Sequence, residues 1–456
     1  MEVKGVVQMK KIAIAASSAI ALYATLTNLG VAASTEEAAK LKTTLTPFGA
    51  ERAANADGTI PAWTGDALKP PAGRAHGSIG PAPFADEKPL FQITAGNMDK
   101  YASKLSEATK YMLKTYPDYR LDVYPTHRTS VAPQWVYDNT FKNATRAKTD
   151  KDDLQLVDAY GGIPFPIPKS GIELIWNHYT HWQGSTVHTN FPNYLITSDG
   201  RLQTAAVINV TDQYGLYNKN SDVKSFNGVY WEHKGVTTAP SRSSGEALVG
   251  IWYTDFKDKE IGSWQYLPGQ RRVRKLPNVN YDTPNFYTSG VTQFDEAYGF
   301  FGKPDQMNFR IVGKREMYIP YNTNKLNMAT PDKAFGPHFP NPDLVRWELH
   351  RVWEVEATVK EGMRNVIPKR HLFFDEDSWM IVSADEWDAQ GKLYRGLLSY
   401  PFFAYDLPGV VGLPFIAFDF QARAYSVGGD VTDYTPIEYQ PASFFNPDSM
   451  VQDALR

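Results

Sequence analysis

The sequence contains no cysteine, so we expect neither disulfide bonds nor a lipid attached through a cysteine thiol. A chain of 456 residues must therefore be held together by the burial of its apolar side chains. An excess of charge of one sign is also missing, since the formal net charge is −3. Nucleic-acid-binding domains carry a marked excess of Lys and Arg, so we expect no nucleic-acid partner.

Long hydrophobic runs are scarce. The apolar run Ile12–Leu26 is interrupted by Ser and Thr and falls short of the ~20 strongly apolar residues of a membrane span. It follows Lys10 and Lys11 and precedes Val31-Ala32-Ala33, small residues of the kind that signal peptidase reads. We interpret residues 1–33 as a cleaved signal peptide and expect an exported soluble protein. An uncleaved membrane anchor is the alternative.

Aromatic residues, glycine and proline are abundant, at 13% aromatic with 33 Gly and 31 Pro, which is typical of a β-rich chain with many turns. Asp199-Gly200 and Asn227-Gly228 have the composition of hairpin turns, and Pro268-Gly269 that of a type II turn. The clearest strand is 344–358, with apolar residues at odd positions and polar residues at even positions. This alternation predicts one buried face and one solvated face.

The chain divides at about Gly161. Residues 34–160 predict an N-terminal arm, with Pro-rich extended chain at 61–89 and one amphipathic helix over Asn97–Thr115. Residues 161–456 predict strands joined by turns, with residues 401–456 wrapping back on the sheet. The fold class is mainly β with minor α: a large curled antiparallel sheet, or half-barrel, with an N-terminal arm and helices, residues 34–456 forming one structural unit.

Aromatic and apolar strand positions are the candidate contacts for an apolar ligand. They are Trp264, Tyr266, Trp347, Leu349 and Trp353. Burial of a large aromatic side chain stabilises a fold by ~2–3 kcal/mol, so a filled core explains these residues equally well. A curled sheet can instead enclose a ligand cavity, and the pattern leaves both possibilities open.

One dense basic run, residues 271–275, contains Arg271, Arg272 and Arg274. These three are candidates for contact with an anionic headgroup or an acidic partner. The alternative is pairing across the strands with acidic neighbours such as Glu260, together with stacking on Trp264 or Tyr266.

Metal and catalytic signatures were sought among the histidines. His178, His181 and His188 lie close in sequence but match no zinc-binding spacing, and their aromatic neighbours favour packing, so we expect no metal or other cofactor. Glu348 and His350 share the polar face of the strand 344–358, where they suit acid–base catalysis. Without a nucleophile motif a hydrolase is the weaker hypothesis, and we expect no enzyme and no catalytic residue.

Several stretches together resemble domain-of-unknown-function family 1329, exported proteins of Gram-negative bacteria with a fold similar to the lipoprotein carriers LolA and LolB. The matching stretches span nearly the whole mature chain in order: residues 44–53, 57–65, 161–166, 173–178, 264–277, 313–322, 349–357 and 375–379. The resemblance implies a periplasmic location and a carrier of a lipid or other hydrophobic molecule, held in the curled sheet. It also implies partners such as an RND-type transporter and an outer-membrane β-barrel-like protein.

Three hypotheses about function remain open. The first is a periplasmic binding or carrier protein that shields an apolar molecule and passes it to envelope partners, with the N-terminal arm or the helix 97–115 as a lid. The second is a non-catalytic scaffold that docks an RND-type transporter to an outer-membrane protein. The third is a hydrolase that uses Glu348 and His350.

Overall fold

The computed structural model describes residues 32–276, 279 and 281–453. The predicted signal peptide falls almost wholly outside these residues. The helices are α1 (Thr35–Ala39), α2 (Glu107–Thr115), α3 (Gln134–Arg146), α4 (Gly171–Tyr179), α5 (Asn324–Asn327), α6 (Pro331–Ala334) and α7 (Ser449–Asp453). Among the described residues, no helix has both the length and the apolar character needed to cross a bilayer.

Short 3₁₀ helices supplement them: η1 (Lys40–Lys42), η2 (Met98–Lys104), η3 (Gly215–Tyr217), η4 (Ser241–Ser243), η5 (Pro268–Gln270), η6 (Phe286–Thr288), η7 (Phe294–Gly299), η8 (Pro304–Gln306), η9 (Pro342–Leu344) and η10 (Ala442–Phe445). The first ten strands are β1 (Phe91–Ile93), β2 (Leu121–Val123), β3 (Lys148–Asp150), β4 (Gln155–Val157), β5 (Thr186–Ile196), β6 (Leu202–Gln213), β7 (Val229–Ala239), β8 (Ala247–Tyr253), β9 (Gly262–Leu267) and β10 (Arg272–Lys275). The others are β11 (Met307–Pro320), β12 (Trp347–Val359), β13 (Lys369–Asp375), β14 (Ile381–Trp387), β15 (Leu393–Ser399), β16 (Phe402–Ala404), β17 (Gly409–Val411), β18 (Phe415–Asp419), β19 (Ala424–Gly428) and β20 (Thr435–Pro436).

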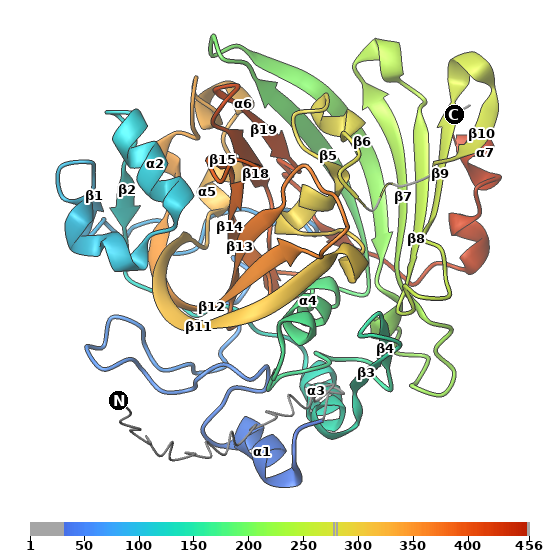
Figure 1. Cartoon of the computed structure of the whole chain (residues 1–456), viewed down its shortest axis with the longest axis horizontal. Helices are drawn as coiled ribbons and strands as arrows, with labels where there is room; N and C mark the ends of the chain where they lie inside the picture. Colours follow the sequence, from blue (N-terminus) through green and yellow to red (C-terminus); the bar gives the residue numbers. More distant parts are fainter. Residues whose placement is uncertain (1–31, 277–278, 280, 454–456) are drawn as a thin grey trace, which may run out of the picture.

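One sheet of 16 strands organises the molecule (Figure 1). Its order is β1-β2-β12-β13-β14-β15-β18-β19-β5-β6-β7-β8-β9-β10, with β11 paired to β12 and β20 paired to β5. The order does not return to its first strand, so the sheet is curled and open, as predicted. The pairing is antiparallel except for one parallel contact between β2 and β12.

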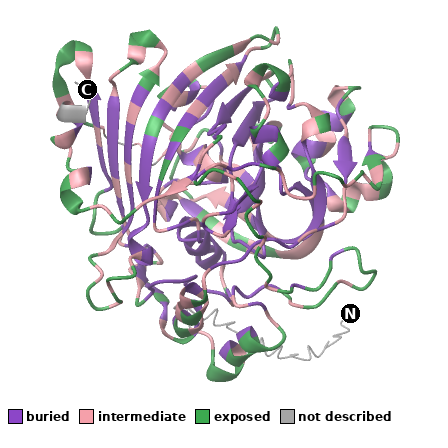
Figure 2. Cartoon of the chain, turned by 180° about the vertical axis from the view of Figure 1, so that it is seen from behind, coloured by how far each residue is buried: buried purple, intermediate pink, exposed green. Residues whose placement is uncertain are grey.

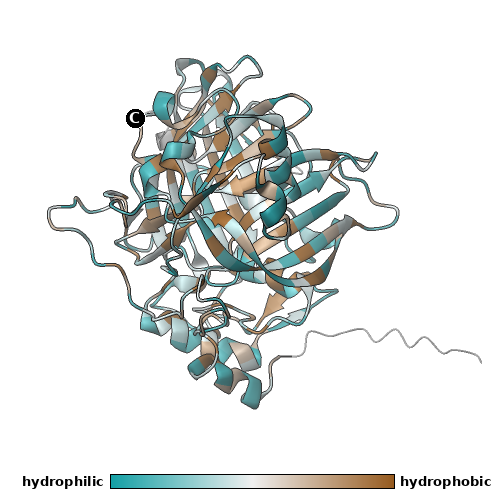
Figure 3. Ribbon diagram, turned by 90° about the vertical axis from the view of Figure 1, so that its left-hand side faces the viewer, coloured by the Kyte–Doolittle hydropathy of each residue, from teal (hydrophilic) through white to brown (hydrophobic). Residues whose placement is uncertain are grey.

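The two faces of the sheet bury separate cores. On the concave face, the largest apolar cluster surrounds α4, all nine residues of which are buried (Figure 2). On the other face, a second cluster lies beneath α2, and a smaller one lies beneath α7. Hydrophobic and hydrophilic residues alternate along many strands, as Figure 3 shows, because successive side chains point to opposite faces.

The predicted helix 97–115 is two helices. The chain is extended at Leu105, and Ser106 then caps α2 by accepting the backbone N–H of Thr109 through its Oγ, at 3.1 Å. Asp385 of β14 accepts the N–H groups of Glu107 and Ala108, each at 2.8 Å. Periodicity alone missed the break because apolar residues recur on both sides of it.

Three other expectations require correction. Asn227-Gly228 is not a hairpin turn, because a long connection separates β6 from β7, whereas Asp199-Gly200 does join β5 to β6. Pro268-Gly269 joins β9 to β10 through a 3₁₀ turn in which Arg271, not Gly269, has a positive φ, of 50°. Residues 401–456 do not merely wrap back on the sheet, since β18 and β19 lie in its interior between β15 and β5.

The polar face of β12 is not solvated along its whole length. Glu348 is 0% exposed and His350 is 1% exposed, although the alternation predicted a wet face. The segment 126–130 and the end of β11 cover this half of the strand. Buried polar groups of this kind require partners, which are described below.

Candidate functional site

A cavity of about 100 Å³ lies between the concave face of β5–β9 and the connection from β10 to β11. We call residues 281–301 of that connection the covering segment. Within it, η6 packs against β5, β6 and β19, and η7 packs against β14, β15 and β18. The lining residues are Phe191, Asn193, Ile208, Val210, Asp212, Trp231, His233, Leu248, Trp252, Ser263, Val279, Asn285, Tyr287, Phe294, Ala297, Tyr298, Phe301 and Phe415. The lining is mostly apolar, so the cavity favours an apolar guest.

Strand register explains why these residues converge. Val210 of β6 lies opposite Gly235 of β7, which lies opposite Leu248 of β8. Residues directly opposite one another point to the same face of a sheet. The row therefore forms the floor of the cavity, and the absence of a side chain at Gly235 leaves room for Ile208 Cγ2 and His233 Nε2, which lie 2.9 and 3.1 Å from the position of a Cβ atom there.

Aromatic rings form one wall. The ring centroids of Trp231 and Trp252 are 4.0 Å apart, and Phe301 of the covering segment lies edge-on at 4.6 Å from Trp231. Trp252 lies over Gly250, where a Cβ atom would come within 2.2 Å of the indole Cζ3. Glycine at position 250 is therefore required for the indole to lie along the sheet.

One polar pair interrupts the apolar lining. His233 Nδ1 lies 2.8 Å from Asp212 Oδ1, and the indole Nε1 of Trp231 donates to the same oxygen at 3.0 Å. Asp212 and His233 face each other across β6 and β7. The carboxylate thus fixes the orientations of both rings, as a hydrogen-bonded carboxylate commonly does for histidine.

Buried ion pairs hold the covering segment to the sheet. Asp295 Oδ2 lies 2.9 Å from Arg370 Nη2 of β13, and Glu296 pairs with Arg395 of β15. Burial, followed by the charge of Glu296, raises the pKa of Glu386 well above its ordinary value. The segment is therefore attached by charge on one side while its aromatic residues face the cavity.

Two buried histidines of α4 and its C-terminal extension lie beside the cavity. A void of about 20 Å³ lined by His178 and His181 shares Trp231, Tyr298 and Phe301 with the main cavity. Burial lowers the pKa of His181 to about 4 and that of His178 well below its ordinary value. His178 Nδ1 accepts the backbone N–H of Ile381 at 3.2 Å. Both rings are thus neutral packing groups, and the more distant His188 is exposed.

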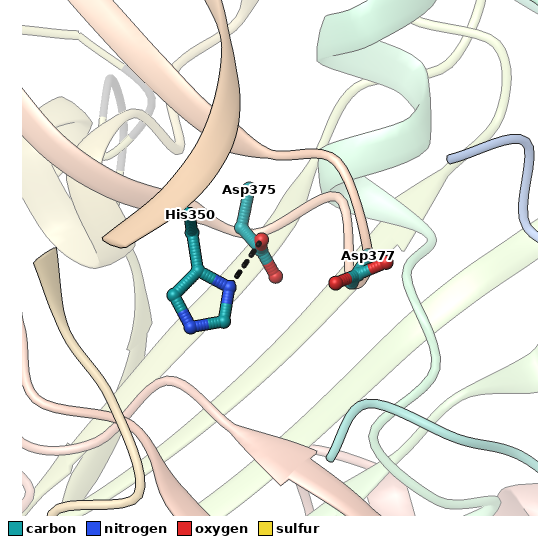
Figure 4. Close-up of side chains that lie close together, drawn as sticks. All are labelled: His350, Asp375 and Asp377. Atoms are coloured by element: carbon teal, nitrogen blue, oxygen red, sulfur yellow. Dashed lines mark ion pairs between the residues drawn. The ribbon is translucent and has the colours of Figure 1, made fainter. Parts of the chain in front are cut away.

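His350, Asp375 and Asp377 lie close enough together to suggest a metal site (Figure 4). Arg128 donates to both carboxylate oxygens of Asp377, at 2.7 and 2.8 Å. Burial works to lower the pKa of His350, but the Glu348 hydrogen bond and the Asp375 charge outweigh it and raise the pKa. Because Arg128 already occupies both oxygens of Asp377, the group fits a buried charge network better than a metal site.

The same network bears on the predicted acid–base pair. Glu348 Oε2 accepts the backbone N–H of His127 at 2.7 Å, and Asn322 Nδ2 donates to Oε1 at 3.0 Å. His350 stacks on Tyr321 with ring centroids 4.1 Å apart. Both side chains are buried among protein partners, an arrangement suited to holding β12 against β11 and the segment 126–130.

The five predicted ligand contacts do not come together. Trp264 and Tyr266 lie on the face opposite the cavity, in the cluster beneath α7. Trp347 and Leu349 belong to the cluster beneath α2, and Trp353 packs against the edge of the concave core. None of the five is among the residues that line the described cavity. Their role as ligand contacts stays a prediction.

The three predicted basic contacts lie at the end of the sheet. Arg271 sits in the turn before β10, and Arg272 and Arg274 are exposed on the strand. Arg274 Nη2 donates to Gln265 Oε1 at 2.9 Å, and Lys275 pairs with Glu260, the residue expected from the sequence. Their contact with a headgroup or partner stays a prediction.

The residues that line the cavity were not among those predicted from the sequence. A signal was present in β6, where Ile208, Val210 and Asp212 alternate with outward-facing residues. Another was the aromatic-rich segment 286–301, which has neither strand nor helix periodicity. A loop with many aromatic side chains and no regular element of its own is typical of a functional cover.

Comparisons with known proteins identify the family. The model of the family described as "Protein of unknown function (DUF1329)" matches residues 92–451, so the chain belongs to this family. Uncharacterized protein PA3922 of Pseudomonas aeruginosa is 38% identical over 394 residues, which cover 82% of this chain and 83% of that protein.

Solved structures similar to the chain include two from related groups. A putative outer membrane lipoprotein-sorting protein domain from Vibrio parahaemolyticus aligns with a TM-score of 0.43 at 12% identity, covering 62% of this chain and 98% of that one. A DUF1329 family protein from Desulfovibrio piger aligns with a TM-score of 0.41 at 11% identity, covering 59% of this chain and 92% of that one.

Proposed function

We propose that the protein is a periplasmic binding or carrier protein for a lipid or other hydrophobic molecule. The observation that carries the proposal is the cavity beneath the covering segment, where aromatic and aliphatic side chains enclose space that the fold does not fill. Its guest leaves water for an apolar surface, at ~25 cal/mol per Å² buried. Export by the N-terminal segment, and transfer of the guest to an envelope partner, are parts of the same proposal.

The covering segment serves as the lid. Neither the N-terminal arm nor the region 97–115 lines the cavity, and α2 packs on the opposite face of the sheet. A cavity of about 100 Å³ accepts a ring or part of an acyl chain with the segment in its present position. A guest longer than the cavity requires the covering segment to move away from the sheet. This movement exposes the concave face beneath the segment.

Filling the cavity tests this function. Ala297→Trp places an indole in the cavity from the covering segment, and Ala422→Trp adds the same side chain at the exposed turn between β18 and β19. The measurements are native mass spectrometry and organic extraction of periplasmic protein, followed by titration with a fluorescent apolar probe. We expect A297W to lose the passenger and the probe, and A422W to retain both. Unchanged binding of the passenger and the probe by A297W would refute this site. A wild-type protein that carries no passenger and binds no probe would favour the docking scaffold.

A further inference from the structure

The polar pair in the cavity has one atom without a partner. His233 Nδ1 is engaged with Asp212, whereas His233 Nε2 has no hydrogen-bond partner among the described residues. The nitrogen leans over Gly235, where a Cβ atom would lie 3.1 Å from it. The ring thus lies along the cavity floor, and His233 is one of the residues that line the cavity.

An imidazole paired with a carboxylate is costly in such a lining. The Asp212 side chain is 8% exposed and that of His233 is 13% exposed, and the other lining residues carry no Lys, Arg or Glu. Burial of an ion pair without full hydrogen bonding is unfavourable compared with apolar packing. Orientation of Trp231 by Asp212 explains the carboxylate, but it does not explain an imidazole whose second nitrogen is open.

A carboxyl group complements this nitrogen in either protonation state. A neutral imidazole with its hydrogen on Nδ1 accepts the O–H of a carboxylic acid at Nε2, and an imidazolium donates from Nε2 to a carboxylate. The two arrangements differ only in the position of one proton along the contact. An ester offers no hydrogen to a neutral imidazole and no charge to an imidazolium.

We infer that the guest of this cavity is an apolar monocarboxylic acid whose carboxyl group contacts His233 Nε2. The inference rests on the proposed function and names the chemical class of its ligand. The apolar part of the acid lies against Trp231, Trp252 and Phe301, and the carboxyl group lies beside His233.

Calorimetric titration of the delipidated full chain with decanoic acid, methyl decanoate and 1-decanol tests the inference. We expect the acid to bind at least tenfold more tightly than the ester. His233→Asn keeps an N–H close to the position of Nδ1, and so keeps the Asp212 contact, but removes Nε2. We expect H233N to abolish the preference while binding of the ester changes less than twofold.

Two further variants complete the test. His188→Asn makes the same substitution at an exposed histidine on the other face of β5, and should keep the preference. His233→Gln places a nitrogen near the position of Nε2 and should restore part of the preference for the acid. Such recovery would show that H233N loses the preference because the contact is lost and not because the protein is unfolded. Equal binding of acid and ester, or binding of decanol as tight as that of the acid, would overturn the inference and leave the apolar carrier standing. No binding of any of the three compounds would refute the carrier function itself.

Discussion

Asp295 of the covering segment lies 2.9 Å from Arg370 of β13, and the two side chains are 2% and 0% exposed. Asn365 Nδ2 donates to the same carboxylate oxygen at 3.0 Å. The segment that closes the apolar cavity is thus attached to the sheet through a desolvated ion pair. Removal of one partner of such a pair is strongly destabilising, because it leaves a buried charge without compensation.

We expect Asp295→Asn to loosen the covering segment, because it leaves the Arg370 guanidinium with a weaker partner in a buried site. The free energy of unfolding should fall by about 3 kcal/mol, the scale of a broken buried pair. Hydrogen exchange should increase first within 286–301. Lys275→Ala removes an exposed partner of Glu260 and serves as the control, with little effect expected. Uniform exchange across the whole sheet in D295N would contradict a local role.

Gly250→Ala should damage the cavity wall. The added Cβ atom would lie 2.2 Å from Trp252 Cζ3, so the indole must move away from the sheet and into the cavity. We expect the free energy of unfolding to fall by about 1–3 kcal/mol and the binding of an apolar probe to weaken. Gly269→Ala is the matched control, because a Cβ atom there meets nothing within 4 Å. Unchanged probe binding in G250A would show that the indole position is irrelevant to the guest.

The stability of the protein should depend on the protonation of Asp430. Burial raises the pKa of Asp430 to about 8. The folded state keeps this proton between the ordinary pKa and about pH 8, whereas the unfolded state loses it, so the contribution to stability falls as pH rises. Asp430→Asn removes this dependence. Denaturant unfolding between pH 5 and 8 measures the free energy of unfolding of both proteins. The value for the variant should increase relative to that of the wild type by up to about 1.4 kcal/mol per pH unit. A constant difference between the two proteins would contradict the shifted pKa.

Arg128 and Asp377 should behave as a coupled pair. Arg128→Met removes the two N–H donors of the buried Asp377 carboxylate. Asp377→Leu leaves the guanidinium with two backbone carbonyl groups and the more distant carboxylate of Glu376. Each single variant should lose about 3–5 kcal/mol of unfolding free energy, and the double variant should lose less than their sum. Additive losses in denaturant unfolding would show that the two side chains act independently.

The local elements were predictable where a periodic pattern was complete. The strand 344–358, the Asp199-Gly200 turn and the β9–β10 hairpin follow from side-chain alternation and turn chemistry. The burial of Glu348 was not predictable, because the groups that cover it, at His127 and Asn322, lie far away in the sequence. Period-two alternation reports which residues share a face and cannot report what covers that face.

The cavity escaped prediction for a related reason. Its lining includes Phe415 of β18, which is brought to β5 by the pairing of β19 with β5, and this pairing joins residues more than two hundred positions apart. Its cover is an irregular segment whose aromatic residues gain meaning only from the strands beneath them. The large aromatic residues of the sequence therefore predicted buried positions, but not which of them line the cavity. Trp231 and Trp252 lie in the cavity wall because the strand register places them opposite each other on β7 and β8.

The curled sheet ends at β10, and among the described residues no strand pairs with the outer side of β10. An unpaired edge offers its backbone N–H and C=O groups to any passing chain and invites intermolecular strand addition. Arg272, Arg274 and Lys275 occupy this edge, and their mutual repulsion discourages two copies from joining there. The basic run therefore reduces aggregation. Replacing these side chains with threonine would remove the repulsion and allow copies of the chain to associate into fibrils through the edge of β10.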